Sequence, residues 1–267
     1  MIDLHCHLLD SAVREPQLLK EAVEMCREAV AEGIHTLVAT PHWDENASVP
    51  PVSPSEMAPR VEALTRETAG ALTIKTGFSV RFTPSLPELV SEYGPALALG
   101  GGRHILVSFP TREIPASAEE TWDVLSDLGY GVVIAHPECH LSLRRNGGRL
   151  AGWVAQGAVL QIDAASVTGH HGREIKRFAL QCIRDHAPNV VVASNASNTS
   201  TRPFRMREAA NILDKNFGPP HAKGLVNEWP GRIIGGQTVA ESPSPRESII
   251  QRVSRGLKVL REQISLY

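Results

Sequence analysis

The chain has 267 residues, of which 42% are hydrophobic and 21% charged, and its formal net charge is −2. This composition is typical of a globular protein and excludes a disordered, collagen-like or coiled-coil chain. Without an excess of positive charge we expect no nucleic-acid partner, and without an apolar run of spanning length we expect no membrane insertion. The start lacks a signal-peptide pattern, and the four cysteines contain no CxxC pair. These features predict a cytoplasmic protein with free thiols.

Short β-branched runs alternate with helical stretches, which predicts an α/β fold with a mainly parallel sheet. We expect strands at Ile2–Cys6, Ile34–Thr40, Ala71–Thr76, His104–Phe109, Gly131–His136, Ala158–Asp163 and Val190–Ser194. We expect helices at Pro16–Glu32, Glu56–Thr68, Ala118–Leu128, Gly172–His186, Pro203–Phe217 and Glu247–Ile264. Seven strands separated by helices, with no linker of the domain-boundary type, favour one closed or nearly closed βα barrel over an open sheet.

Three stretches have the composition of loops: His42–Ser55, Gly94–Arg103 and Ala240–Pro245. The first directly follows a strand, so we expect it on the face where βα barrels carry their sites. Residues 1–267 are expected to form a single domain, in which 240–267 are a linker and a C-terminal helix. The apolar residues of that helix recur at helical spacing, and two interpretations stay open: packing on the barrel, or a contact that forms a homo-oligomer.

Histidines follow three of the expected strands at the point where each strand ends. His5 and His7 are two residues apart at the end of the first strand, a spacing that places both imidazoles on one side of the backbone. His42 follows the second strand and His136 the fifth. Because the carboxyl ends of barrel strands meet at one face, these four side chains are candidate metal ligands.

Several longer segments occur in a characteristic order: IDLHCHLL, EMCREAVAEGIHTLVATPH, VVIAHPE, QIDAASVTGHHGR and VVASNASNTSTRPFRM. They resemble the polymerase-and-histidinol-phosphatase (PHP) superfamily and, within it, the bacterial metal-dependent protein-tyrosine phosphatases of capsule and exopolysaccharide operons (CpsB/CapC type). The resemblance runs from Met1 to about Gly235. It implies a distorted (β/α)7 TIM-like barrel of the PHP type and a trinuclear metal cluster. It also implies hydrolysis of phosphotyrosine on the tail of a polysaccharide-export tyrosine kinase.

The resemblance extends to particular positions of the family's site. Four positions at which the family keeps histidine ligands are intact: His5, His7, His42 and His136. The segment TRPFRM is similar to the family's phosphate-facing arginine segment, which implies catalytic roles for Arg202 and Arg205. The implied cofactor is a divalent metal, manganese in the first place, with iron and zinc as alternatives.

Five other expected ligands are missing. The residues found in their place are Arg14, Ser79, Ser108, Asn195 and Ser197. Four of these replace acids, which makes the site five charge units less negative, and the fifth replaces a histidine. Two divalent ions about 3.5–4 Å apart repel by roughly 15–20 kcal/mol at an effective dielectric of about 20, and bridging carboxylates normally offset that repulsion. We therefore expect fewer than three ions and reduced activity.

A single ion remains compatible with the residues present. Its ligands would be His5, His7 and His136, with Asp163, Asp10 or Glu138 as a fourth that the sequence does not decide. Such an ion lowers the pKa of a bound water, and arginines can hold phosphate oxygens through forked donors. The alternative from another functional class is a non-catalytic, phosphatase-like protein that binds a phosphorylated or anionic partner segment.

Three further features have weaker functional interpretations. The spacing from Cys139 to Arg145 matches the C-x5-R pattern of cysteine-dependent phosphatases, but the segment has no glycine to wind a phosphate loop. We therefore interpret Cys139, which stands where the family has arginine, as a spacer residue. The pair His170 and His171 is interpreted as a solvated loop feature. Alternation along the strand places the side chain of Asp3 on the same face as His5. We expect it to make either a contact that supports a metal ligand or a buried structural hydrogen bond.

Overall fold

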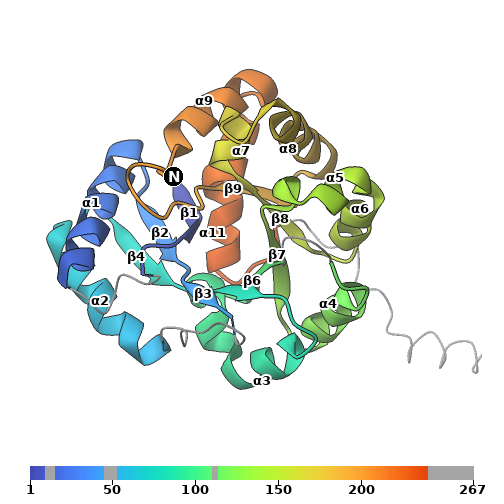
Figure 1. Ribbon diagram of the computed structural model, residues 1–267, viewed down its shortest axis with the longest axis horizontal. Coiled ribbons are helices and arrows are strands. Elements are labelled where there is room, and N and C mark those ends of the chain that lie inside the picture. Colours follow the sequence, from blue (N-terminus) through green and yellow to red (C-terminus); the bar gives the residue numbers. More distant parts are fainter. Residues whose placement is uncertain (10–15, 45–52, 110–113, 240–267) are drawn as a thin grey trace, which may run out of the picture.

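The computed structural model describes residues 1–9, 16–44, 53–109 and 114–239, in which strands and helices alternate (Figure 1). The strands are β1 (Ile2–Cys6), β2 (Thr36–Ala39), β3 (His42–Trp43), β4 (Thr73–Thr76), β5 (Ser79–Arg81), β6 (His104–Ser108), β7 (Gly131–Ala135), β8 (Val159–Asp163) and β9 (Val190–Ala193). The longer helices are α1 (Pro16–Glu32), α2 (Pro54–Glu67), α3 (Leu86–Leu97), α4 (Ala118–Asp127), α6 (Gly147–Ala155), α8 (Arg173–His186) and α9 (Met206–Phe217). The shorter ones are α5 (Leu141–Arg145), α7 (Ala164–Thr168), α10 (Pro219–Lys223) and α11 (Trp229–Ile234).

The strands pair in parallel around a ring. One part has the order β1-β2-β4 and the other β3-β5-β6-β7-β8-β9. The chain continues from one part into the other at two places: β3 follows β2 after two residues, and β5 follows β4 after two residues. Each of these pairs occupies one strand position of the ring. The ring returns to its start through a parallel bridge between Cys6 and Ala196, where the hydrogen bonds His7 N to Ala196 O and Asn195 N to His5 O are both 2.8 Å long. The α/β barrel with seven strand positions is therefore confirmed.

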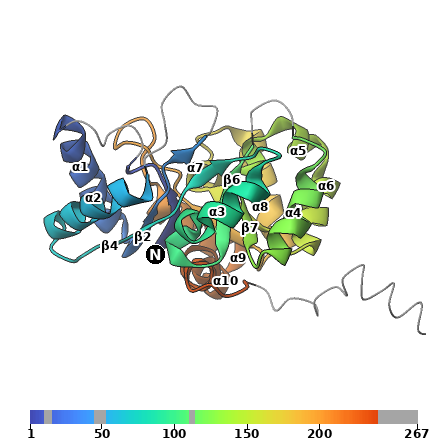
Figure 2. The same cartoon turned by 90° about the horizontal axis from the view of Figure 1, so that it is seen from below.

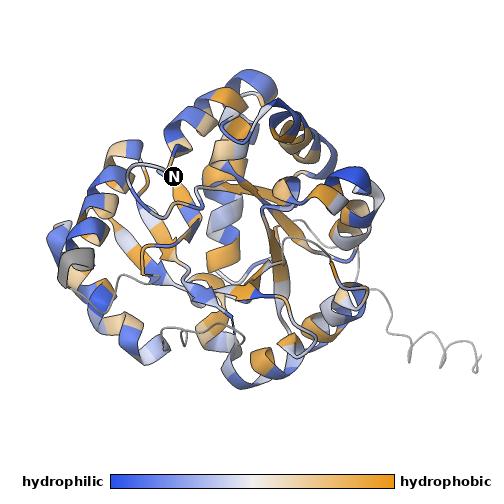
Figure 3. Cartoon of the chain, in the orientation of Figure 1, coloured by the Kyte–Doolittle hydropathy of each residue, from blue (hydrophilic) through white to orange (hydrophobic). Residues whose placement is uncertain are grey.

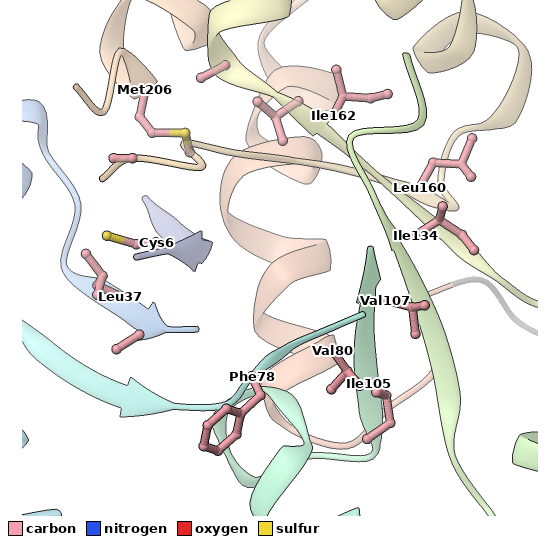
Figure 4. Close-up of a cluster of buried hydrophobic side chains, with 14 of the residues drawn as sticks. Cys6, Leu37, Phe78, Val80, Ile105, Val107, Ile134, Leu160, Ile162 and Met206 are labelled. Carbon is pink, nitrogen blue, oxygen red and sulfur yellow. The ribbon is translucent and has the colours of Figure 1, made fainter. Parts of the chain in front are cut away.

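Buried apolar side chains form two layers, one on each side of the strands. The outer layer lies between the strands and the helices and includes Cys6, Leu37, Val80, Ile134 and Ile162 (Figure 4). The inner layer fills the ring: Ile2, Leu4, Val38, Leu99, Leu106, Val133, Ala135, Val159, Val191, Ala193, Ile233 and Val239. Hydropathy follows this division, because apolar residues gather on the strands and the inward helix faces (Figure 3). Alternation along each strand thus supplies both layers.

Helix α11 lies within the ring in the view down the barrel (Figure 1). Its Ile233 is buried in the inner layer. A Cβ added at Gly102 would lie 2.4 Å from the carbonyl oxygen of Ile233, so only glycine allows this close approach. In the side view α10 lies below the strands, at the lower end of the molecule (Figure 2). The helices after α9 therefore fill the end of the barrel opposite the carboxyl ends of the strands.

A β-bulge interrupts β1 where the HxH motif begins. The register against β2 shifts by one residue between Asp3 and Cys6. Simple alternation would place Leu4 and Cys6 on the same face, yet Leu4 belongs to the inner layer and Cys6 to the outer one. Bulges of this kind redirect side chains and are common beside functional sites.

All seven predicted strands are present. The five predicted helices within the described residues are confirmed, Pro16–Glu32 with the predicted ends and the other four with shifted ends. Two loop predictions were partly wrong. His42 and Trp43 form β3, and Ser53 caps α2, where its side chain accepts from Glu56 N in a capping box. Gly94–Leu97 form the last turn of helix α3 and are not a loop. Gly94 is needed there for its small size, because Tyr130 packs against it. The predicted segments Ala240–Pro245 and Glu247–Ile264 lie outside the described residues. Among the described helices, none is long and apolar enough to cross a membrane.

Candidate functional site

The four predicted histidines gather at the carboxyl ends of β1 and β7 and on β3. The ring of His5 lies 4.9 Å from that of His7 and 5.8 Å from that of His136. The rings of His7 and His42 are 4.3 Å apart. His5 and His7 are buried, His136 is half-buried and His42 is exposed. The structure brings the four side chains together, and their role as metal ligands stays a prediction.

Two contacts of His7 in this group have the spacing of ligands that share one metal ion. His5 Nε2 and His7 Nε2 are 3.1 Å apart. Two imidazole nitrogens, each roughly 2.0–2.1 Å from a metal, are about 2.9–3.4 Å apart when the angle at the metal lies between a right angle and the tetrahedral value. Asn195 Oδ1 lies 3.0 Å from His7 Nε2 and adds an oxygen donor. The donor set of two imidazoles and an amide oxygen thus fits one borderline divalent ion.

A hydrogen-bonded glutamine orients His5. Gln161 Oε1 lies 2.8 Å from His5 Nδ1, and Gln161 Nε2 donates to Asp163 Oδ1 at 3.0 Å. Because Gln161 Nε2 is the donor to the carboxylate, its Oε1 must accept the Nδ1 proton of His5. The lone pair of His5 Nε2 then points at His7, and such support from outer residues is what fixes a metal-binding tautomer. Sequence reasoning missed Gln161, a polar residue inside the apolar strand VLQID.

Asp163 is the buried carboxylate at the base of the site. Its Oδ1 accepts from Gln161 and its Oδ2 accepts from Asn195 Nδ2 at 2.9 Å. Three residues were considered as the fourth ligand. Asp163, the first of them, instead accepts hydrogen bonds from Gln161 and Asn195, which contact the histidines. Asp10 lies outside the described residues. Glu138 points toward the start of α7: its Oε1 accepts from Ser166 Oγ at 2.7 Å and from the backbone N–H of Asp163 at 2.8 Å.

The substituted positions bring no carboxylate to the histidines. Ser79 pairs with His42 across β3 and β5, and its buried Oγ has no hydrogen-bond partner among the described residues. Ser108 donates to the carbonyl oxygen of Val80 at 3.4 Å. Arg14 lies outside the described residues. Asn195 and the serines are neutral, so the described part of the site carries few negative charges with which to hold several cations.

The two candidate arginines have different surroundings. Arg202 is close enough to lower the pKa values of His5 and His136 through its positive charge, although burial lowers both more strongly. Arg205 forms an ion pair of 3.8 Å with Glu208 and acts electrostatically on Glu28 of α1. Arg202 is exposed at the mouth of the site, where an anion can reach it. Its surroundings fit the predicted phosphate contact, whereas these contacts of Arg205 are with carboxylates.

Backbone strain is concentrated at the site. Four non-glycine residues of the described chain have a positive φ: Ala69, His136, Asn195 and Arg205. His136 (φ 36°) and Asn195 (φ 52°) both direct side chains into the histidine group. Left-handed backbone at non-glycine residues costs energy and is typical of functional sites. The strain therefore supports a functional role for His136 and Asn195.

Asp3 ties the first strand to the last. Its Oδ1 accepts from Ser194 N at 2.9 Å and from His5 N at 3.3 Å, and its Oδ2 accepts from Ser194 Oγ at 2.5 Å. Burial raises the pKa of Asp3 to about 6, against the effect of these hydrogen bonds. Of the two expectations for Asp3, the structure shows the buried structural hydrogen bonds, which fix the backbone beneath His5.

Comparison with known proteins agrees with this geometry. The family model for capsular polysaccharide synthesis, CpsB/CapC, matches residues 1–235. The chain is 31% identical to the tyrosine-protein phosphatase YwqE of Bacillus subtilis over 244 residues, which cover 91% of this chain and 95% of that protein. It is 26% identical to the tyrosine-protein phosphatase CpsB of Streptococcus pneumoniae over 246 residues, 90% of this chain and 100% of that protein.

The fold has matching relatives among solved structures. A structure from work on YwqE and CpsB, described as metal-dependent tyrosine phosphatases, superposes with a TM-score of 0.81 at 31% identity and covers 92% of this chain and 99% of that one. The phosphotriesterase of Mycobacterium tuberculosis shares the fold alone, with a TM-score of 0.56 at 13% identity over 89% of this chain and 94% of that one. The extent of the family match, the identity to YwqE and the histidine-bearing strand ends agree, and the chain belongs to the CpsB/CapC family.

Proposed function

We propose that this chain is a metal-dependent protein-tyrosine phosphatase that works with fewer than three ions and with reduced activity. Its relatives YwqE and CpsB are named tyrosine-protein phosphatases. The substrate would be a phosphotyrosine on the tail of a polysaccharide-export kinase, and the location would be the cytoplasm. The observation that carries the proposal is the 3.1 Å approach of His5 Nε2 and His7 Nε2, with Gln161 directing the nitrogen of His5.

The chain's own residues divide the work. His5, His7 and Asn195 Oδ1 would hold the ion, with His136 and His42 beside them. A bound divalent ion supplies a water of lowered pKa and polarises the phosphoryl oxygen. Arg202 would contact the phosphate from the solvent side and favour the negative charge of the transferring group. Burial lowers the pKa of His5 well below its ordinary value, so that the ring is neutral and its Nε2 keeps a lone pair at neutral pH.

The identity of the ion belongs to the proposal as well. Imidazoles with an amide oxygen suit manganese, iron and zinc, and the resemblance favours manganese. The neutral ligands are consistent with one ion, because a second ion nearby would need carboxylates to offset the repulsion. The four substituted positions in the described residues supply none: Ser79, Ser108, Asn195 and Ser197.

The test is a phosphatase assay on a phosphotyrosine peptide with added manganese. We expect slow, metal-dependent turnover by the native chain and none by His7→Ala. His35→Ala is the matched control, because His35 is exposed and bonded to Asn227, away from the site. Turnover that persists in His7→Ala, or that needs no metal, would contradict the proposal.

A second candidate is a non-catalytic protein that binds a phosphorylated or anionic segment. It is favoured by one observation: Arg202 is exposed and acts on His5 and His136 with its positive charge, while the substituted positions Ser79, Ser108 and Asn195 bring no carboxylate that would repel an anion. The assay separates the two candidates when peptide binding is measured alongside turnover. Binding that is weakened by Arg202→Ala, without release of phosphate by the native chain, would favour the second.

A further inference from the structure

A second group of metal-ligating side chains lies beside the histidines, contains none of them and shares Asp163 with their site. Cys139 Sγ, an oxygen of Asp163 and a ring nitrogen of His171 all lie within 4.8 Å of one another. Cys139 ends the turn after β7, Asp163 ends β8, and His171 lies in the turn between α7 and α8. Three elements that are distant in sequence thus bring a thiol, a carboxylate and an imidazole to one point.

We propose that these three residues form a site for a zinc-class divalent ion. Cys139 Sγ and His171 Nδ1 are 3.5 Å apart. Two ligands at about 2.3 Å (sulfur) and 2.0–2.1 Å (nitrogen) from zinc, at the tetrahedral angle, are about 3.6 Å apart. The existing separation therefore already matches a shared ion. Binding replaces the thiol proton, which passes to solvent, and the thiolate becomes the ligand that selects zinc or cobalt over manganese.

A buried carboxyl group lies next to the proposed ligands. Glu138 is fully buried, and its Oε2 has no hydrogen-bond partner among the described residues. Its Oε1 lies 3.9 Å from Cys139 Sγ and binds Ser166, whose Oγ is 3.1 Å from His171 Nδ1. A buried polar oxygen without a partner is costly. A divalent ion at the thiol would place a positive charge next to it.

The group is also accessible and distinct from the histidines. His171 is exposed and Cys139 half-buried, so an ion can enter from solvent at this side. Asp163 connects the two groups, because its oxygens also accept from Gln161 and Asn195. The proposed site differs from the phosphatase site in its sulfur ligand. Metal binding at the sulfur can therefore be measured separately from metal binding at the histidines.

The experiment titrates the full chain with Co²⁺ and follows the near-ultraviolet charge-transfer band from thiolate to cobalt. We expect the band in the native chain and in His7→Ala, because the sulfur site does not need that histidine. Cys139→Ser should abolish the band, and Cys182→Ala, which removes a buried thiol outside the group, should keep it. Zn²⁺ should displace Co²⁺ and remove the band.

A pair of exposed histidines gives the matched comparison. His171→Ala should weaken Co²⁺ binding by about tenfold or more, since losing a ligand costs at least as much as losing a residue that supports one. His170→Ala, an exposed neighbour bonded to Thr168, should leave the band unchanged. Absence of a thiolate band in the native chain, a band that survives in Cys139→Ser, or equal effects of the two histidine variants would overturn the proposal.

Discussion

Asn195 donates a hydrogen bond of 2.9 Å from its Nδ2 to Oδ2 of Asp163. An aspartate at position 195 would have no proton to donate and would face Asp163 as a second carboxylate. The amide thus stabilises the site without a metal, at the expense of the charge with which the site could hold one.

Asn195→Asp should therefore change stability and metal binding in opposite directions. Without metal, Asp163 loses a donor, and the free energy of unfolding should fall by about 1–3 kcal/mol. With Mn²⁺, the added carboxylate should raise the affinity and recover the lost stability. Urea denaturation with and without Mn²⁺ measures both. Asn195→Ala is the control, with a similar loss and no metal-dependent recovery; recovery in both variants would refute this role of the carboxylate.

Gln161→Leu should weaken metal binding without touching a ligand. The change removes the acceptor that holds the Nδ1 proton of His5, so that the ring can rotate or shift its proton. We expect about a 10–100-fold loss of Mn²⁺ affinity, the usual cost of losing a residue that supports a ligand. Isothermal titration checks this, with the exposed Gln237→Leu as control. An unchanged affinity would show that the tautomer of His5 is fixed by other contacts.

Substitutions of Arg202 and Arg205 should have different effects on the affinity for inorganic phosphate. Arg202→Ala should weaken the binding of inorganic phosphate about tenfold or more, because hydrogen bonds to charged groups contribute about 1.5–3 kcal/mol. Arg205→Ala removes the ion pair with Glu208 and should change phosphate affinity much less. Equilibrium dialysis with phosphate distinguishes them. Equal losses in the two variants would place Arg205 at the phosphate, as the resemblance implies.

His104 should make stability fall in mild acid. Burial lowers the pKa of this histidine from 6.5 to about 4, so the folded protein takes up the proton only near pH 4. The unfolded chain takes it up near pH 6.5, and protons therefore favour unfolding between these values. The contribution is complete above pH 6.5 and is lost as the pH falls toward 4, by about 3 kcal/mol in total.

Denaturation of the native chain and of His104→Gln at several pH values tests this prediction. The difference in free energy between the two proteins should shrink steadily from neutral pH to pH 4. Acidic groups with raised pKa values, such as Asp3, contribute equally to both proteins and cancel in the difference. A constant difference would mean that His104 does not titrate in this range.

Much of the site could be predicted because strand ends are easy to find in this sequence. Buried β-branched runs mark the strands, and histidines directly after them must meet at one end of a parallel barrel. The same reasoning could not find Gln161, because a single polar residue in a strand does not show which side chain it contacts. The bulge in β1 was equally hidden, since it arises from the register with β2.

The missed elements have local physical reasons. Helix α3 contains Pro87, Gly94 and Pro95, residues that usually break helices, but Pro87 lies in the first turn and Gly94 makes room for Tyr130. Cys139 and His171 are 32 residues apart and lie in separate turns. Only the packing of α7 and α8 beside the end of β7 brings them together, and sequence spacing does not encode that packing.

The filling of the barrel by α11 and the inner apolar layer determines how molecules reach the histidines. Ile233 and Leu106 belong to a continuous buried cluster inside the ring, so that side of the barrel offers no aqueous passage through the described chain. Whatever binds at the carboxyl ends of the strands must therefore arrive and depart on the side of the barrel where those ends lie. A peptide and the phosphate cleaved from it would both use that side.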